Sequence, residues 1–330
     1  MKSINIKEFG SLDNLVFGSY HEPILGEEEV LIEVYCAGVS FADILVVEGK
    51  YQDTPELPFV PGLEVSGMIK KIGNNVKHLK IGDEVVALTK WGGFSELVCV
   101  NTSFVYKKSD NMDFDVAACM TINYGTSYHA LVERARIKKD DKILILGASG
   151  GIGLSAIEIA KAVGSNVTAA ASSERKLSVC AEYGADNLIL TTNDNIEDSL
   201  KDSKERKFDI IYDTLGGNYS EDSLSFISWE GQLLIVGFAT GKIPKINSNK
   251  LLLKGCSALG IFWGPFARGN TNFNLSCIKE LNKLYDEKKI KLVSPKLFHM
   301  EEFKEAFLEI KNRKSIGKIC LYTDLFSKGR

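Results

Sequence analysis

Residues that ligate metals are few and dispersed in this sequence. Its 330 residues include four histidines and seven cysteines, and no two cysteines are spaced as C-x-x-C. Protein zinc sites draw on closely spaced Cys and His ligands. We therefore expect no metal centre, and we expect the cysteines to be reduced and mostly buried, as in a reducing compartment.

Long apolar runs and a strong net charge are also missing. No run approaches the ~20 apolar residues of a transmembrane helix, and the N-terminal residues MKSINIKEFG lack the apolar core of a secretion signal. The formal net charge is −3 and the basic residues are dispersed, so neither a nucleic acid nor a membrane is expected as a partner. We expect a cytoplasmic protein that acts on a small molecule.

The length and a change of pattern along the chain indicate two domains, since a domain averages about 150 residues. Residues 1–122 contain short β-branched runs between Gly and Asn turns. Val30–Tyr35, Val65–Ile72 and Glu84–Leu88 are examples. These runs predict a mostly β domain.

In residues 123–265 buried strands alternate with amphipathic helices. Lys142–Leu146 (KILIL) is an apolar strand, Ile152–Val163 a helix and Val167–Ala171 a second strand. The alternation predicts an α/β domain with a doubly wound parallel sheet.

Two further predictions concern the ends of this pattern. A helix is predicted over Ser127–Arg136, before the first strand. The closing strand, Lys318–Tyr322, could return to the first domain, so that residues 266–330 complete it.

A glycine-rich turn directly follows the KILIL strand and opens the next helix. Such a turn lets the backbone approach a pyrophosphate, while the free N–H groups of the helix face its negative charge. The alternative is a tight turn with only a structural role. The residues predicted to contact a dinucleotide here are Gly147, Ser149, Gly150, Gly151, Ile152 and Gly153.

The end of the second strand favours NADPH over NADH. NAD-binding proteins usually carry an acidic residue there, but this strand ends in Ser172 and Ser173, followed by Arg175 and Lys176. Hydroxyls and cations suit a 2′-phosphate. The acidic Glu174 beside them argues against NADPH. Alternatively, Ser173 could cap the next helix while Arg175 and Lys176 are only solvated.

An ordered set of motifs resembles the quinone oxidoreductases of the medium-chain dehydrogenase/reductase superfamily, the zeta-crystallin-like group. The motifs are Gly38–Asp43, Gly49–Tyr51, Pro58–Glu64, Gly82–Val85, Gly92–Glu96, Asn123–Tyr128, the glycine turn, Tyr183–Asp186, Gly216–Gly217, Gly237–Phe238 and Gly317–Lys318. The resemblance implies a GroES-like catalytic domain interrupted by a Rossmann domain, with the cofactor in the cleft between them. It also implies a homodimer joined mainly through Rossmann-domain edges.

The resemblance extends to the zinc-dependent members of the superfamily, but the ligand residues differ. Those enzymes have Cys where this chain has Ser40 and His where it has Leu63, and their third ligand would fall near Ile122. Leucine and isoleucine cannot ligate a metal. The resemblance therefore implies a zinc-independent enzyme.

The resemblance also implies roles for further residues. Ser40 and Thr126 would lie near the nicotinamide, and Tyr51 and Tyr128 are candidate donors in the substrate cleft, although either tyrosine could instead pack in the core or an interface. The remaining residues predicted to bind the cofactor are Gly216, Gly237, Phe238, Ile261, Phe262, Trp263, and, toward the 2′-phosphate, Arg313 and Lys318.

The implied activity is metal-free hydride transfer from NADPH to a quinone or a similar activated carbonyl compound. Enone, alkenal and enoyl-thioester reduction share the same framework and remain alternatives. A short-chain dehydrogenase is another, because Tyr285 and Lys289 fit Y-x-x-x-K. An alternative of a different class is a non-enzymatic NADPH-binding sensor or structural protein.

Overall fold

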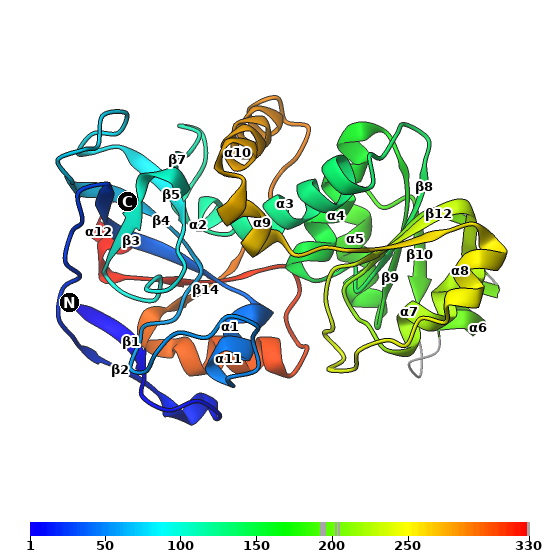
Figure 1. The fold of residues 1–330 in the computed structure, drawn as a ribbon, viewed down its shortest axis with the longest axis horizontal. Coiled ribbons are helices and arrows are strands. Elements are labelled where there is room, and N and C mark those ends of the chain that lie inside the picture. The colour runs from blue at the N-terminus through cyan, green and yellow to red at the C-terminus, as the bar shows by residue number, and fades with distance from the viewer. Residues whose placement is uncertain (192–195, 202, 204, 329–330) are drawn as a thin grey trace. The chain divides into compact units, whose positions relative to one another are not determined.

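The computed structural model describes residues 1–191, 196–201, 203 and 205–328, and its chain divides into two compact units (Figure 1). Unit 1 comprises Met1–Ile122, Asn270–Asn282 and Val293–Arg330. Unit 2 comprises Asn123–Gly269 and Lys283–Leu292.

The unit boundaries differ from the predicted ranges 1–122 with 266–330, and 123–265, in two short segments. Residues 266–269 belong to unit 2, where the Phe266 ring stacks on His129 with centroids 4.0 Å apart. Residues 283–292 also belong to it, because the Lys291 N–H donates to Glu158 Oε1 at 2.6 Å. Residues 192–195, 202, 204 and 329–330 of the predicted ranges lie outside the described residues.

Unit 1 is built on a mostly antiparallel seven-stranded sheet in the order β14-β15-β3-β4-β5-β7, with β6 also paired to β3. Strand β15 runs antiparallel to β3, with Cys320 opposite Gly38, so the closing strand does return to the first unit. The strands of unit 1 are β1 (Lys2–Ile6), β2 (Leu15–Ser19), β3 (Glu29–Val39), β4 (Glu64–Ile72), β5 (Glu84–Leu88), β6 (Leu97–Asn101), β7 (Val105–Lys107), β14 (Lys296–His299) and β15 (Ile319–Tyr322).

Helices pack against this sheet, among them α2 and α12 on β3 and α11 on β15. Helix α1 packs against α11, and Phe307 of α11 lies edge-on to Phe94 with ring centroids 5.8 Å apart. The helices of unit 1 are α1 (Phe41–Val47), α2 (Phe114–Ala117), α11 (Phe303–Lys311) and α12 (Asp324–Lys328), and it also holds the first parts of α3 (Met120–Tyr128) and α10 (Thr271–Asp286).

Unit 2 is an α/β unit with a six-stranded, wholly parallel sheet in the order β10-β9-β8-β11-β12-β13. This is the doubly wound order of dinucleotide-binding folds. Residues 143–146 of the central strand are fully buried, as a strand covered on both faces requires. The strands are β8 (Lys142–Leu146), β9 (Asn166–Ala171), β10 (Asn187–Leu190), β11 (Phe208–Asp213), β12 (Ile227–Ile235) and β13 (Ser257–Gly260).

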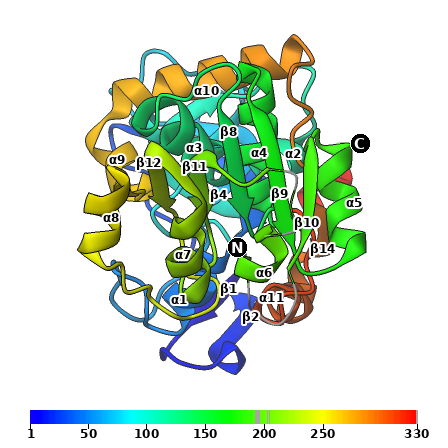
Figure 2. The ribbon, with the colours of Figure 1, turned by 90° about the vertical axis from the view of Figure 1, so that its right-hand side faces the viewer.

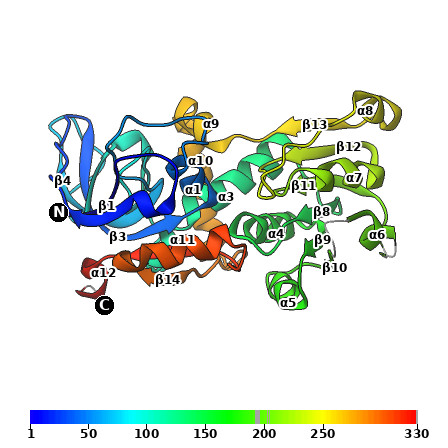
Figure 3. The same cartoon turned by 90° about the horizontal axis from the view of Figure 1, so that it is seen from below.

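Helices cover both faces of this sheet (Figures 2 and 3). Helices α4 and α5 pack on β8, β9 and β10, while α6 and α7 pack together on the other face. The helices that lie wholly in unit 2 are α4 (Gly151–Val163), α5 (Glu174–Glu182), α6 (Ile196–Lys201), α7 (Asn218–Ser223), α8 (Ser248–Lys254) and α9 (Trp263–Gly269).

The helix before β8 differs from its prediction. It begins at Met120, seven residues before the predicted start, and continues after Tyr128 as a π-helical segment, His129–Arg134. Gly125 and nearby β-branched residues have low helix propensity, but Asn123 and Tyr124 are buried there, and packing outweighs propensity. Among the described residues, no helix is long and apolar enough to cross a membrane.

Candidate functional site

The loop between β8 and α4 has the geometry of a phosphate cradle. Gly147 has φ +74°, and a Cβ there would lie 2.3 Å from Thr214 Oγ1. A Cβ on Gly153 would lie 2.5 Å from the Ala148 carbonyl oxygen. Gly150 is different, because its φ is −76° and a Cβ would come no closer than 3.6 Å to another atom. The fold therefore needs glycine at 147 and 153, whereas Gly150 leaves room for a ligand.

Helix α4 presents unpaired N–H groups at this loop. Its N-cap residue, Gly150, has no side chain that could accept from them. The helix is 13 residues long, and its dipole favours an anion at this end. Gly151 and Ile152 are half-buried in the first turn, and Ser149 is buried beside it. These residues can surround a pyrophosphate with backbone donors.

Three strand ends meet beside the loop at the carboxyl edge of the sheet. Thr214, after β11, donates through Oγ1 to the Leu146 carbonyl oxygen at 2.8 Å. A Cβ on Gly216 would lie 2.8 Å from Phe238, which with Gly237 follows β12. Connections leave β8 and β11 toward opposite faces, and ligands of such sheets bind in the crevice that results. The structure thus brings the predicted residues Gly216, Gly237 and Phe238 to the glycine loop.

Asp213, the last residue of β11, fixes this edge and was missed by the sequence interpretation. Its carboxylate accepts from the N–H groups of Leu215 at 2.8 Å and Gly216 at 3.1 Å, and from Ser220 Oγ. Burial raises the pKa of Asp213, and these three donors oppose the increase. An acidic residue at the end of the buried strand FDIIYD was the available signal.

The end of β9 lies next to the glycine loop, because the Ala148 N–H donates to the Ala170 carbonyl oxygen at 3.1 Å. Ser173 caps α5 by accepting from the Lys176 N–H at 3.4 Å, so the capping interpretation is confirmed. Lys176 Nζ lies 3.2 Å from Ser172 Oγ, which keeps a cation and a hydroxyl together at this strand end.

Arg175 and Glu174 are both exposed on the first turn of α5. No acidic side chain stands on the last residues of β9 or in its turn before Glu174. A carboxylate at that position would repel a 2′-phosphate. Because this segment has none, Ser172 and Lys176 are the polar groups at the end of β9 that suit a 2′-phosphate.

A buried hydroxyl cluster lies behind the glycine loop. Ser127 Oγ lies 2.9 Å from Tyr212 Oη and 2.8 Å from Ser155 Oγ, which donates to the Asn123 carbonyl oxygen at 3.1 Å. Burial raises the pKa of Tyr212 and keeps the phenol neutral. The cluster joins α3, α4 and β11, and it fixes the neighbouring Thr126, which is 7% exposed.

The segment Ile261–Trp263 follows β13 and was predicted to contact the nicotinamide, but two of its three side chains are buried in the protein. Ile261 and Trp263 are 7% and 3% exposed, and a Cβ on Gly125 would lie 2.7 Å from the Trp263 ring. Phe262 is 44% exposed. Trp263 therefore packs on α3, and Phe262 is the most exposed of these three residues. Tyr128, also predicted at the site, is half-buried on α3.

Unit 1 contains a separate buried polar centre around Glu64. Its Oε2 accepts from Thr121 Oγ1 at 2.7 Å and from the Ile122 N–H at 2.8 Å, and its Oε1 lies 2.8 Å from Lys318 Nζ. Burial alone would lower the pKa of Lys318, but Glu64, Cys119 and Asp43 together raise it. The lysine is therefore charged and only 4% exposed. This corrects the expectation that Lys318 reaches a 2′-phosphate, because its charge is committed to Glu64.

Ser40 begins α1 beside this centre. Its N–H and Oγ both donate to Asp43 Oδ2 at 2.7 Å. Burial raises the pKa of Asp43 to about 6, although the two Ser40 donors and Lys318 oppose the increase. The Ser40 hydroxyl is thus held by a carboxyl group whose pKa is raised by burial.

The resemblance led us to expect the counterparts of zinc ligands at Ser40 and Leu63 and near Ile122. Leu63 and Ile122 have no ligating atom in their side chains. Glu64, which follows Leu63, uses both oxygens on Thr121, the Ile122 N–H and Lys318. Across the described residues, no three His, Cys, Asp or Glu side chains are grouped as a metal site.

The other predicted residues of unit 1 lie on turns. Tyr51 is half-buried after α1, where its N–H donates to the Leu45 carbonyl oxygen at 3.1 Å. Arg313 is exposed after α11 with φ +55°. The Y-x-x-x-K alternative loses its geometric basis, because α10 ends at Asp286, between Tyr285 and Lys289.

Comparison with known proteins assigns each unit to a family. Residues 26–110 match the alcohol dehydrogenase GroES-like domain, and residues 151–277 match the family described as zinc-binding dehydrogenase. The chain is 34% identical over 303 residues to quinone oxidoreductase-like protein 2 homolog of Nematostella vectensis, covering 91% of this chain and 83% of the relative.

Two solved structures have the same fold. Escherichia coli quinone oxidoreductase, crystallised with NADPH, superimposes with a TM-score of 0.90 at 24% identity, covering 98% of this chain and 100% of the other. CurK enoyl reductase superimposes with a TM-score of 0.87 at 24% identity, covering 98% and 99%.

Proposed function

The chain belongs to the quinone oxidoreductase-like family of the medium-chain dehydrogenase/reductase superfamily, and from this we propose that it reduces quinones or similar activated carbonyl compounds with NADPH. The observation that carries the proposal is the phosphate cradle at Gly150. The fold does not need a glycine at this position, so its missing side chain leaves space beside the backbone for a ligand. NADPH is the nucleotide in the Escherichia coli structure of the same fold.

The preference for NADPH over NADH rests on the end of β9. Ser172 and Lys176 lie together there, next to the glycine loop, and supply a hydroxyl and a cation for the 2′-phosphate. Arg175 and Arg313 are exposed and remain further candidates for this contact. Lys318 is not one of them.

The residues of the chain bind and orient the reactants. When bound, the reduced nicotinamide supplies the hydride. The glycine loop holds the pyrophosphate, and the hydroxyl cluster behind it holds Thr126 on a rigid helix. Ser40, Tyr51 and Tyr128 are the hydroxyl donors proposed for the oxygen of the acceptor, where hydrogen bonds stabilise developing negative charge. The Ser40 hydroxyl donates its single proton to Asp43 in this structure, so it can serve the acceptor only by exchanging that bond.

The reaction is proposed to proceed without zinc. The argument is the donor set, because two of the three ligand positions carry Leu63 and Ile122, which offer no ligating atom. The Glu64–Lys318 pair adds a cation to the same centre, and an ammonium group repels a divalent metal. Metal analysis of the purified protein together with activity in a chelator tests this point. Zinc-dependent turnover would contradict it.

Reduction of an enone or enoyl thioester is the second candidate for the acceptor, and the fold match to CurK enoyl reductase favours keeping it. Both reactions place negative charge on an oxygen conjugated to the accepting carbon, so the same hydroxyl donors serve both. The shape of the acceptor distinguishes them, and a substrate series is needed.

Self-association as a homodimer is part of the proposal. Strand β13 is the last strand of its sheet, and the segment that precedes it in the chain exposes large apolar side chains, including Ile243 at 76% and Leu252 at 79%. Pairing of two such edges would cover them. Sedimentation velocity tests this, and a mass of one chain at micromolar concentration would contradict it.

Stopped-flow oxidation of NADPH against a series of quinones, enones and enoyl thioesters tests the activity, with NADH as the control. We expect turnover with at least one acceptor class and a clear preference for NADPH. Equal or better rates with NADH would overturn the role of Ser172 and Lys176. If the purified protein binds no pyridine nucleotide, the whole proposal fails.

A further inference from the structure

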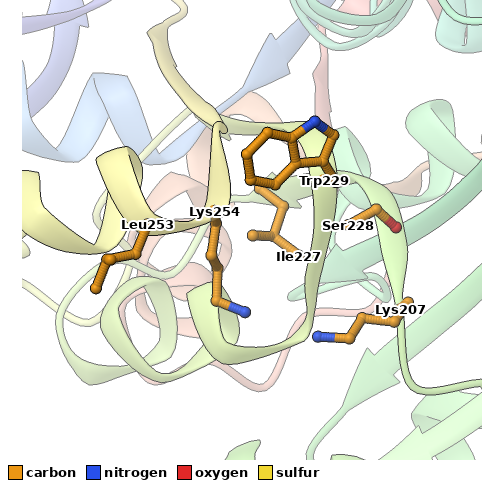
Figure 4. Close-up of a pocket in the computed structure, with 6 residues that line it drawn as sticks. All are labelled: Lys207, Ile227, Ser228, Trp229, Leu253 and Lys254. Atoms are coloured by element: carbon orange, nitrogen blue, oxygen red, sulfur yellow. The ribbon is translucent and has the colours of Figure 1, made fainter.

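A pocket of about 370 Å³ opens at the amino edge of the unit 2 sheet, opposite the edge that carries the glycine loop (Figure 4). Lys207 directly precedes β11, and Ile227, Ser228 and Trp229 begin β12. Leu253 and Lys254 end α8. The pocket therefore shares no residue with the proposed cofactor site.

Two ammonium groups converge in this pocket. Lys207 Nζ and Lys254 Nζ donate to the same carbonyl oxygen, that of Ser225, at 3.3 and 3.1 Å. Within the described chain, neither ammonium is paired with a carboxylate. Burial and then the nearby Lys207 lower the pKa of Lys254. Two like charges this close are unfavourable unless an anion offsets them.

The wall beside the lysines is an accessible aromatic ring. Trp229 is 71% exposed. One part of its ring packs against Gly255, where φ is +56° and a Cβ would lie 3.0 Å from the indole. The rest of the ring faces solvent, next to the 74% exposed side chain of Leu253. Figure 4 shows the indole and the two lysine side chains around one space. The backbone thus holds the indole in place while much of its surface stays available for stacking.

We propose that this pocket binds the phosphate monoester of a planar aromatic compound. The phosphate, which carries nearly two negative charges at neutral pH, lies between Lys207 and Lys254. Ser228 also lines the pocket, but its hydroxyl points away from the two ammonium groups in Figure 4, so the lysines alone contact the phosphate. The aromatic group stacks on the open face of Trp229. The volume suits a ligand the size of a mononucleotide.

Calorimetric titration of adenosine 5′-monophosphate into the protein saturated with NADP+ tests this inference. The NADP+ fills the glycine-loop site, so any remaining binding must occur elsewhere. We expect one AMP per chain, and about tenfold weaker binding in K207Q and in K254Q, since each removes one charge-assisted contact. We expect W229A to weaken AMP but not inorganic phosphate. Lys138→Gln, which removes an exposed lysine outside the pocket, should bind AMP as the unaltered chain does.

Three results would overturn the inference. One is the absence of AMP binding to the NADP+-saturated protein, and another is AMP binding that K254Q leaves unchanged. The third is that every variant that loses AMP binding also changes its sedimentation coefficient. Trp229 and Leu253 would then form a subunit contact and not a ligand site. NADPH turnover is measured on the same samples. Its persistence in K207Q and K254Q separates this pocket from the proposed activity.

Discussion

Substitution of Lys318 by methionine is the sharpest test of how the centre of unit 1 is built. Methionine keeps much of the apolar stem of lysine but removes the ammonium group that lies 2.8 Å from Glu64 Oε1. The Glu64 side chain is 1% exposed and cannot turn to solvent without losing its bonds to Thr121 and Ile122. Its negative charge would then remain buried without a cation.

Removing one partner of a buried ion pair costs about 3–5 kcal/mol, and we expect a loss of that size in the free energy of unfolding for K318M. The double variant E64Q/K318M should lose less, because glutamine can still accept from Thr121 and carries no charge. The free-energy change in the double variant minus the summed changes in K318M and E64Q measures the coupling of the pair.

Urea unfolding of the unaltered chain, K318M, E64Q and E64Q/K318M, followed by fluorescence and circular dichroism, gives these free energies. A loss under about 1 kcal/mol for K318M would refute the reasoning, since it would mean that Glu64 does not need the cation. Steady-state kinetics supplies a second readout. If Lys318 instead held the 2′-phosphate, K318M would raise the KM for NADPH more than about tenfold without affecting NADH, whereas we expect the two cofactors to respond alike.

Three other substitutions test the site. G150A should preserve the unfolding midpoint, since a Cβ there comes no closer than 3.6 Å to other atoms, yet weaken NADPH binding about tenfold or more by fluorescence titration; unchanged affinity would remove Gly150 from the cradle. K176Q should lower kcat/KM for NADPH about tenfold and leave NADH almost unchanged, and an equal effect on both cofactors would contradict contact with the 2′-phosphate. Burial raises the pKa of Asp43 from 3.8 to about 6, so the unfolded chain loses this proton first and the native state loses relative stability as the pH rises between these values. D43N should therefore gain stability relative to the unaltered chain between pH 4 and pH 7, by up to about 3 kcal/mol in urea unfolding, and a difference that does not change with pH would contradict this.

The sequence predicted unit 2 well because its signals are local. An apolar strand, a glycine turn and an amphipathic helix follow one another within residues 142–163, and the β8 and α4 boundaries agree with the prediction to within one residue. Alternation of such segments leaves a parallel sheet as the economical arrangement. The α3 start at Met120 was missed because it depends on burial of Asn123 and Tyr124, which local propensity does not show.

The polar centres were harder to predict because their members are distant in the chain. Glu64 and Lys318 are separated by most of the sequence, and only the pairing of β15 with β3, next to β4, brings them together. The Gly317–Lys318 motif was recognised by resemblance, but the direction of the Lys318 side chain depends on how β15 pairs with β3. The same holds for the lysine pair of the amino-edge pocket, which needs the end of α8 to lie beside the start of β11.

The late pairing of β15 has a consequence for biosynthesis. Strand β3 lies between β15 and β4, so the first unit cannot complete its sheet until Ile319–Tyr322 have left the ribosome. All six strands of unit 2 have emerged by Gly260, and domains generally fold as units during synthesis. A nascent chain would therefore hold a nearly finished nucleotide-binding unit while β3 still lacks its pairing with β15. Premature termination near residue 315 would leave that part of β3 as an open edge prone to aggregation.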